Sequence, residues 1–463
     1  MARLEKAQNF HFQFGVDAVS FGHMSYQIPA ASPDSQPAYA LEGMQLTDHR
    51  FSLPLNYAEP DGEKVTVFVR EVVALDRADD DSLPWLVYFQ GGPGFPSPRP
   101  VTKSGWLGEV LKTHRVALLD QRGTGLSSRV LAQNLQKRGS AQEQAEFLTH
   151  FRADNIVRDA EAIRKGLCGD DKKWVGMGQS YGGFCLLTYL SFAPHGLSGV
   201  VITGGVACVK RHIDDNYRLT YQKVLEKNAE YYQRYPQDRE LAKEILAELL
   251  EKDIRLPSGG RLTGRRFQQL GMLYGMSGGF ETMHYLLESA FIGEGADREL
   301  SFDFLNQIER LSAFETNPFF AVLHETIYGE GYATNWSAER LRAEFPSFEL
   351  DPANEVRFTG EMIVPSMFDD YVQLQPMKEC AEILARKEDW GPLYDLDQLA
   401  SNEVPVSAIS YYSDMYVPIE WSRETALHMP RFYQWVTNEW EHNGIGVDGP
   451  RIARVLLDKL KEV

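Results

Sequence analysis

Cysteine is scarce in this chain, with only four among 463 residues. They are Cys168, Cys185, Cys208 and Cys380, and no two of them form a C-x-x-C pair. This spacing excludes the dense disulfide framework of a small secreted protein and gives no support to a cysteine-based metal site. The first ten residues carry early charges and lack the apolar run of a secretory signal. We therefore expect a cytoplasmic protein.

Basic charge is also in short supply. Lysine and arginine total 47 against 65 aspartates and glutamates, which gives a formal net charge of −18. Such a surface repels phosphate backbones and anionic lipid, so we expect no nucleic-acid partner and no membrane partner. The chain also lacks the G-x-x-x-x-G-K-[ST] phosphate loop, the H-E-x-x-H zinc motif and any Cys/His cluster. Because these motifs are absent, we expect no metal and no cofactor. The sequence does not indicate the oligomeric state.

One long segment contains no charged residue at all, from Trp174 to Val209. Its length alone is typical of a membrane span. However, the segment contains eight glycines and Pro194, and its apolar residues come in short blocks. A strand, a turn, a helix and a second strand, buried in one sheet, explain this pattern better.

Strand patterns alternate with helical ones through the first part of the chain and return at its end. Strands that alternate with helices predict a mostly parallel sheet with right-handed crossovers. The expected strands lie at residues 64–74, 84–89, 115–120, 174–178, 197–203, 404–412 and 431–437. The clearest expected helices lie at residues 154–167, 181–192 and 450–461.

Between these two parts the pattern changes to long, charged helices, such as residues 239–253. We therefore predict one α/β domain interrupted by a helical insertion. Residues 1–206, with a β-rich N-terminal extension, and residues 401–463 form the two parts of the core, and residues 207–400 form a helical cap. The cap is expected over the C-terminal edge of the sheet, where open α/β folds bind ligands.

The strongest single motif is a G-x-S-x-G sequence, Gly178-Gln179-Ser180-Tyr181-Gly182. It follows a strand-like run and precedes a helix-like one. In the α/β-hydrolase fold, this sharp turn lifts the serine hydroxyl above the sheet, and glycines on both sides relieve the crowding. The motif predicts that Ser180 is a nucleophile rather than an ordinary serine in a glycine-rich turn.

A serine nucleophile needs a base, and this fold orders its triad as serine, acid and then histidine. His442 follows the last strand-like run, where a loop can carry its ring to the nucleophile, whereas His428 falls in a helical pattern and reads as a surface or capping residue. For the acid, Asp414 follows the expected strand at 404–412, while Asp369 and Asp370 lie in the insertion. The chain order therefore predicts a triad of Ser180, Asp414 and His442.

A second glycine cluster, Gly91-Gly92-Pro93-Gly94, follows the expected strand at 84–89. An oxyanion hole requires backbone N–H groups that the substrate can reach, so residues without bulk are suited to it. We expect the N–H groups of Gly92 and Tyr181 to form this hole. The alternative is that the glycines only form a tight turn.

Taken together, five motifs resemble those of the proline iminopeptidase (prolyl aminopeptidase) family, in its longer bacterial form. The motifs are Gly91-Gly-Pro-Gly94, Asp120-Gln-Arg-Gly-Thr-Gly-Leu-Ser127, Gly178-Gln-Ser-Tyr-Gly-Gly183, Ser413-Asp-Met-Tyr-Val417 and Glu441-His-Asn-Gly444. The resemblance runs from about residue 40 to the C-terminus. It implies an α/β-hydrolase core with a helical cap, and it implies the same triad independently of the chain-order argument.

The resemblance also implies an activity and its substrate. Members release N-terminal proline from short peptides, and cap glutamates bind the free α-amine; the matching residues here are Glu325 and Glu361. One departure is Gln90, which stands where the family usually has histidine before Gly-Gly-Pro-Gly. We therefore expect a serine aminopeptidase that acts on short peptides or aminoacyl amides with a free N-terminus. The alternatives are a carboxylesterase or amidase with the same triad and a catalytically silent binding protein.

Overall fold

The computed structural model describes residues 27–463. Residues 1–26 lie outside the described residues. The start of the predicted β-rich extension and the ten N-terminal residues, which lack the pattern of a secretory signal, therefore lie outside them too. Within residues 27–463, the main strands form one ten-stranded sheet of order β1-β3-β4-β6-β5-β7-β8-β11-β12, with β2 beside β3. Its strands are β1 (Asp34–Ser35), β2 (Tyr39–Leu41), β3 (Met44–Pro54), β4 (Lys64–Ala74), β5 (Trp85–Phe89), β6 (Arg115–Asp120), β7 (Trp174–Gln179), β8 (Leu197–Thr203), β11 (Val406–Tyr411) and β12 (Phe432–Thr437).

The sheet is mixed, with a large parallel part. Strands β6, β5, β7, β8, β11 and β12 run parallel, whereas β1 to β4 pair antiparallel at one side. Strands β8 and β11 are almost wholly buried because helices cover both faces of the sheet there. This arrangement confirms the predicted α/β-hydrolase architecture, and the expected strand positions agree with the observed ones to within about two residues.

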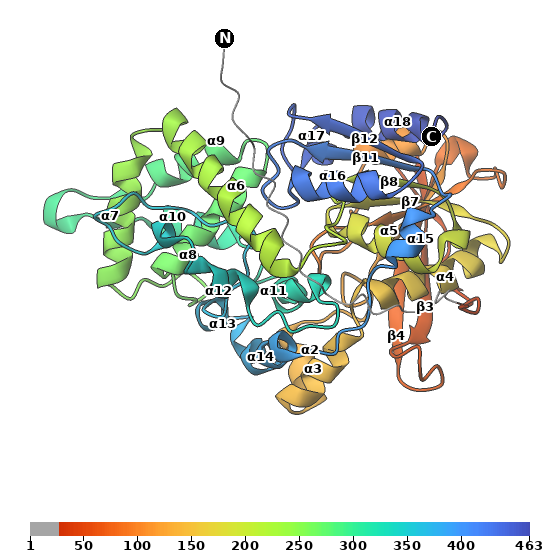
Figure 1. The fold of residues 1–463 in the computed structure, drawn as a ribbon, viewed down its shortest axis with the longest axis horizontal. Helices are drawn as coiled ribbons and strands as arrows, with labels where there is room; N and C mark the ends of the chain where they lie inside the picture. The colour runs from red at the N-terminus through yellow and green to blue at the C-terminus, as the bar shows by residue number, and fades with distance from the viewer. Residues whose placement is uncertain (1–26) are drawn as a thin grey trace, which may run out of the picture.

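The helices of the core flank this sheet (Figure 1). Helix α5 is buried along its whole length, which explains its continuous apolar sequence, and α4 packs beside it with one apolar side. The core helices are α1 (Gly105–Val110), α2 (Ala132–Leu135), α3 (Ala141–Thr149), α4 (Ala153–Cys168), α5 (Tyr181–Phe192), α16 (Ile419–His428), α17 (Gly444–Val447) and α18 (Gly449–Lys459). No helix of residues 27–463 combines the length and the apolar character needed to cross a bilayer.

The chain between β8 and β11 is mostly helical and extends away from the sheet on one side (Figure 1). We refer to this helical region, residues 207–400, as the cap; its exact limits stay a prediction. Its helices are α6 (Ile213–Arg234), α7 (Asp238–Glu251), α8 (Gly264–Gln268), α9 (Gly279–Glu288), α10 (Phe302–Leu311), α11 (Pro318–Leu323), α12 (Ser337–Arg342), α13 (Met367–Asp370), α14 (Lys378–Arg386) and α15 (Leu396–Ala400). The short strands β9 (Phe291–Ile292) and β10 (Glu299–Leu300) form a small hairpin within it.

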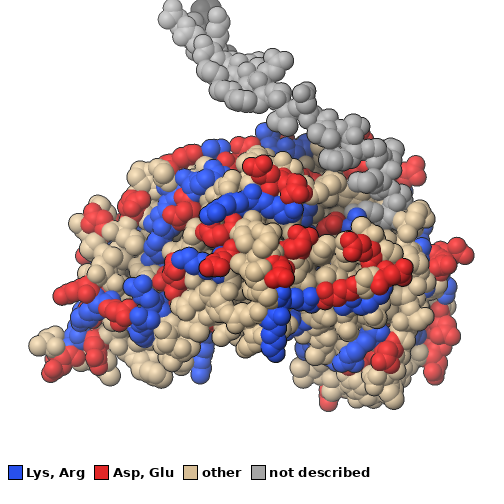
Figure 2. Space-filling model, turned by 90° about the horizontal axis from the view of Figure 1, so that it is seen from below, with Lys and Arg blue, Asp and Glu red and all other residues tan. Residues whose placement is uncertain are grey.

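Acidic and basic side chains are interspersed on the face seen from below in Figure 2. Within the cap, acidic side chains pair with basic ones, for example Glu339 with Arg265 and Glu244 with Arg298.

Candidate active site

The predicted nucleophile lies on the turn between β7 and α5. Ser180 has φ +53° and ψ −123°, a backbone conformation that residues other than glycine rarely adopt. Its N–H donates to the Thr203 carbonyl at 2.9 Å. The neighbouring glycines are required by close packing. A Cβ on Gly182 would lie 2.0 Å from the Phe89 carbonyl oxygen, and one on Gly205 would lie 2.1 Å from the Ser180 carbonyl oxygen. The G-x-S-x-G spacing thus allows a strained turn that holds the serine at the C-terminal edge of the sheet.

Asp414 and His442 come from the loops that follow β11 and β12. His442 Nδ1 lies 2.7 Å from Asp414 Oδ2, and the other oxygen of Asp414 accepts hydrogen bonds from the N–H groups of Tyr416 and Val417. Both side chains are buried, with at most 5% of each exposed. The aspartate is therefore held from both sides, and it fixes the orientation of the imidazole ring.

The electrostatic setting of His442 favours its charged form. Burial lowers the pKa of His442, but the charge and hydrogen bond of Asp414, together with the charges of Glu361 and Glu441, raise it by more, so the pKa lies above the ordinary value. The ring of Tyr416 packs edge-on against the imidazole at 4.8 Å between centroids. The site can therefore stabilise an imidazolium, which is what a general base becomes when it accepts a proton.

A cavity of about 380 Å³ opens between the sheet edge and the cap. Ser180 and His442 both line it, together with Glu361 from the cap. The rest of its wall is largely apolar and includes Phe95, Leu270, Met272, Leu273, Met276, Ile308, Leu311, Phe314, Phe320, Tyr371 and Tyr416. The structure thus brings the predicted nucleophile and base to one apolar cavity, which is also lined by residues of the cap.

The predicted oxyanion loop borders the same cavity. Gly91 packs so closely against the turn that a Cβ there would lie 2.9 Å from Ser180 Cβ, and Gly92 has φ +122°. Tyr181 is the first residue of α5, so its N–H is among those that a helix leaves without an intrahelical partner. These positions support the proposal that the N–H groups of Gly92 and Tyr181 form the oxyanion hole.

Gln90, the departure from the family pattern, also lines this cavity. Its backbone carbonyl accepts a hydrogen bond of 3.0 Å from Gln121 Nε2, and Gln121 belongs to the Asp120–Ser127 motif. The next residue of that motif, Arg122, is fully buried and forms a two-pronged ion pair with Asp159. The motif therefore holds the glycine loop through its backbone, whichever side chain occupies position 90.

The two predicted amine-binding glutamates are placed differently. Glu361 faces the cavity and forms no hydrogen bond or ion pair with any residue in the described part of the chain. Burial raises the pKa of its carboxyl group to about 7; the His442 charge lowers this pKa and the Asp414 charge raises it. Glu361 is thus an unpaired carboxylate close to the candidate triad.

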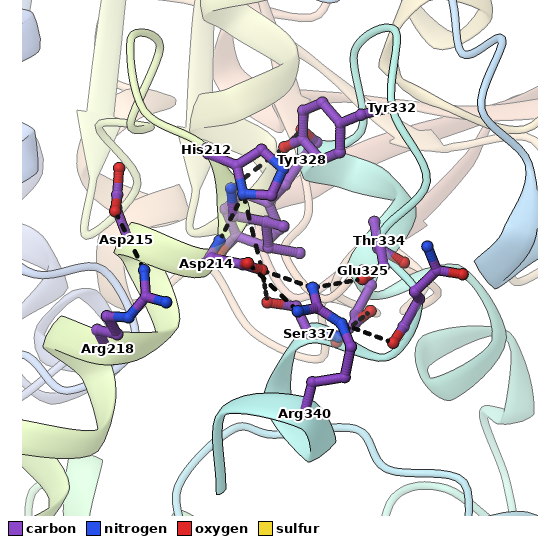
Figure 3. A network of polar contacts seen from close by, with 12 residues as sticks. His212, Asp214, Asp215, Arg218, Glu325, Tyr328, Tyr332, Thr334, Ser337 and Arg340 are labelled. Carbon is purple, nitrogen blue, oxygen red and sulfur yellow. Dashed lines mark hydrogen bonds and ion pairs between the residues drawn. The ribbon is translucent and has the colours of Figure 1, made fainter. Parts of the chain in front are cut away.

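Glu325 is 5% exposed and is not among the residues that line the cavity. Its two oxygens accept hydrogen bonds from the N–H groups of Ser337 and Ala338, at the beginning of α12. Figure 3 shows it within the polar network where α6 meets α12, close to Ser337 and Arg340. These contacts give Glu325 a helix-capping position, and a direct contact with a substrate stays a prediction for this residue.

The histidine and the aspartates that were not assigned to the predicted triad do not line the cavity. His428 ends α16, and its Nε2 lies 2.9 Å from the Leu396 carbonyl. Asp369 pairs with Lys378 at the surface, and Asp370 accepts a hydrogen bond from Thr263. Within residues 27–463, no cluster of three or more His, Cys, Asp or Glu residues could hold a metal ion.

Comparison with known proteins decides the family. A proline iminopeptidase of Aeromonas sobria is 49% identical over 423 residues, which cover 91% of this chain and 97% of that protein. The chain belongs to the proline iminopeptidase family. The model of the alpha/beta hydrolase fold matches residues 84–322.

A second relative differs more from this chain. A proline iminopeptidase of Aspergillus aculeatus is 38% identical over 424 residues, which cover 90% of this chain and 94% of that protein. Among solved structures, a proline iminopeptidase of Mycobacterium smegmatis is 15% identical, with a TM-score of 0.43 over 89% of this chain and 98% of that one. The 49% and 38% identities to the Aeromonas and Aspergillus proteins confirm the resemblance predicted from the five motifs.

Proposed function

We propose that this chain is a serine aminopeptidase that releases an N-terminal residue, proline first, from short peptides. Its family membership supports this activity, since the relative from Aeromonas sobria, a proline iminopeptidase, matches nearly its whole length. The observation that carries the proposal is the position of Glu361, an unpaired carboxylate in the same cavity as Ser180 and His442.

In the proposed reaction, Ser180 Oγ attacks the first carbonyl carbon of the peptide. His442 Nε2 accepts the hydroxyl proton, while its Nδ1–H donates to Asp414. The N–H groups of Gly92 and Tyr181 stabilise the negative oxygen of the tetrahedral intermediate. His442 then returns the proton to the departing amine, and water hydrolyses the acyl-enzyme by the same steps in reverse.

Glu361 explains why the first peptide bond is the one cleaved. A free α-amine carries a positive charge for much of the population at neutral pH, and a carboxylate in a partly dry cavity binds it by charge-assisted hydrogen bonds. Binding the amine at Glu361 places the first residue at a set distance from Ser180. An acylated N-terminus cannot pair with Glu361, so it would leave the carboxylate buried without a partner.

Glu325 contributes at longer range in this proposal. Burial raises the pKa of Tyr217 most, and the charges of Glu325 and Glu361 raise it further, so both carboxylates act on the same part of the cap. Glu325 therefore adds negative potential behind the cavity while it caps α12, and Glu361 makes the direct contact.

The test compares three substrates: proline arylamide, N-acetylproline arylamide and a short neutral acyl ester. Hydrogen bonds to charged groups contribute about 1.5–3 kcal/mol, so Glu361→Gln should lower kcat/KM for proline arylamide roughly 10- to 100-fold. Hydrolysis of the ester should hardly change. Glu325→Gln serves as the matched comparison and should have the smaller effect on kcat/KM.

Wild-type enzyme that cleaves the N-acetyl substrate as well as the free amine would remove the aminopeptidase proposal. The carboxylesterase or amidase would then remain, because neither needs Glu361.

A cytoplasmic location also remains a prediction; all four cysteines are free thiols, which suits a reducing compartment.

A further inference from the structure

The loop that carries His442 is hydrogen-bonded to the cap rather than only to the core. The His442 N–H donates to the Gly275 carbonyl at 3.0 Å, and the Glu441 N–H donates to Ser277 Oγ at 3.1 Å. In return, the Ser277 N–H donates to Asn443 Oδ1 at 2.9 Å. Three consecutive residues of the histidine loop thus take their positions from one short segment of the cap.

An ion pair that is buried on its lysine side joins the same two parts of the molecule, with 27% of the Glu441 side chain exposed. Lys227, on α6 of the cap, is 3% exposed, and its Nζ lies 2.5 Å from Glu441 Oε1. The other carboxylate oxygen of Glu441 is buried and has no hydrogen-bond partner in residues 27–463. Burial raises the pKa of Glu441, and the charge of Lys227 opposes that rise. The ionised state of Glu441 therefore depends mainly on Lys227.

The ion pair can affect the position of the candidate base, because Glu441 directly precedes His442 in the chain. Removing one partner of a buried ion pair leaves the other as an uncompensated charge, which must take up a proton or move toward water. Movement of Glu441 would shift the backbone of His442 through a single peptide unit. Lys227 is not among the residues that line the cavity.

We propose that Lys227 is a positioning residue for the general base: through its ion pair with Glu441, it holds His442 in place against Ser180. The proposal rests on the triad of the proposed function. It also means that the cap, besides covering the cavity, supplies part of the support for the catalytic histidine.

The experiment uses the full-length protein with Lys227→Met and Glu441→Gln, alone and combined. A displacement of about 1 Å at a catalytic group costs on the order of 100-fold, so Lys227→Met should lower kcat for proline arylamide roughly 10- to 100-fold. KM should stay within about twofold, since Glu361 and the cavity wall are unchanged. The double variant should recover part of the loss, because no unpaired charge then remains beside His442.

Helix α6 itself offers a matched control. Lys223, one turn before Lys227, also joins cap and core: its Nζ lies 2.8 Å from Glu420 Oε1 on α16. Glu420 lies at the start of α16, outside the histidine loop. Lys223→Met should therefore leave kcat unchanged. An equal loss in Lys223→Met and Lys227→Met would overturn the proposal, because it would show a general effect of cap docking.

A second measurement separates this proposal from the proposed substrate. A fluorophosphonate forms a bond between Ser180 Oγ and phosphorus with loss of fluoride, and His442 accepts the hydroxyl proton, so no amine recognition is involved. Its labelling rate should fall in Lys227→Met in parallel with kcat, even if proline arylamides prove not to be substrates. If Lys227→Met does not fold, Glu441→Gln gives the same test with a neutral side chain of the same size. A wild-type labelling rate in the folded variant would refute the positioning role.

Discussion

Asp414→Asn is the most revealing single substitution at this site, because the structure fixes which way the new amide must face. One oxygen of Asp414 accepts hydrogen bonds from the N–H groups of Tyr416 (2.8 Å) and Val417 (3.0 Å). The asparagine must place its oxygen there, since the opposite orientation would set an NH₂ group against two buried N–H donors. An unsatisfied buried donor costs about 1–3 kcal/mol, so two of them keep the flipped orientation to a few per cent at most.

With its oxygen so placed, the asparagine points its NH₂ group at His442 Nδ1. The ring must then accept at Nδ1 and carry its proton on Nε2, the nitrogen that accepts the serine proton in the proposed reaction, so it cannot act as the base. The wrong tautomer in a serine protease triad costs about 10⁴-fold in kcat, equivalent to about 5 kcal/mol in the barrier. We expect a loss of that order here, with residual activity from the oxyanion hole and substrate binding.

The assay is kcat and KM for proline arylamide, with circular dichroism to show that the variant is folded. The fluorophosphonate labelling rate should fall in the same proportion as kcat. Asp369→Asn is the control, because Asp369 lies at the surface and pairs with Lys378. Retention of more than a tenth of the wild-type kcat by folded Asp414→Asn would refute the assignment of this aspartate.

Three further predictions follow from the same geometry. Ser180→Ala should lower kcat by roughly 10⁴–10⁶ while the free energy of unfolding changes by less than about 1 kcal/mol; a variant with a tenth of the wild-type rate would exclude Ser180 as the nucleophile. Because His442 must be neutral to accept a proton and its pKa is raised above 6.5, kcat/KM should increase with pH through an apparent pKa above that value; a profile already flat from pH 5 would contradict this. Glu325→Ala should lower the free energy of unfolding in urea by about 2–4 kcal/mol, since two buried N–H groups of α12 lose their acceptors. An unchanged urea midpoint would show that the hydrogen bonds of Glu325 to α12 contribute nothing to stability.

The local motifs were the most predictable part of this protein. The elbow around Ser180 depends in part on contacts between residues close in sequence, such as the approach of Gly178 to Gly182, so its glycine spacing is visible in the sequence, although Gly182 also packs against the distant Phe89. The chain order of the fold then pointed to Asp414 and His442, which the structure finds 2.7 Å apart. These features could be predicted because each is encoded by a short segment.

The cap was much less predictable, because its contacts join segments far apart in the chain. The sequence does not distinguish the roles of Glu325 and Glu361. In the structure, Glu325 accepts hydrogen bonds from two N–H groups of α12, whereas Glu361 faces the cavity. The ion pair between Lys227 and Glu441 links residues 214 positions apart, and no periodicity or motif marks it. Only the packed structure distinguishes a capping carboxylate from one that is open to a ligand.

The order of strands in the sheet has a consequence for how the chain folds during synthesis. Strand β8 ends at Thr203, but its neighbour β11 begins only at Val406, after the whole cap. Domains fold from the N-terminus as they emerge, so the N–H and C=O groups along this edge of β8 stay unpaired while the cap is being made. An exposed apolar strand edge is a template for pairing with other chains. Fragments that end before Val406 should therefore aggregate, and a stall in translation within the cap should do the same, which makes this interval the vulnerable stage in the biogenesis of the enzyme.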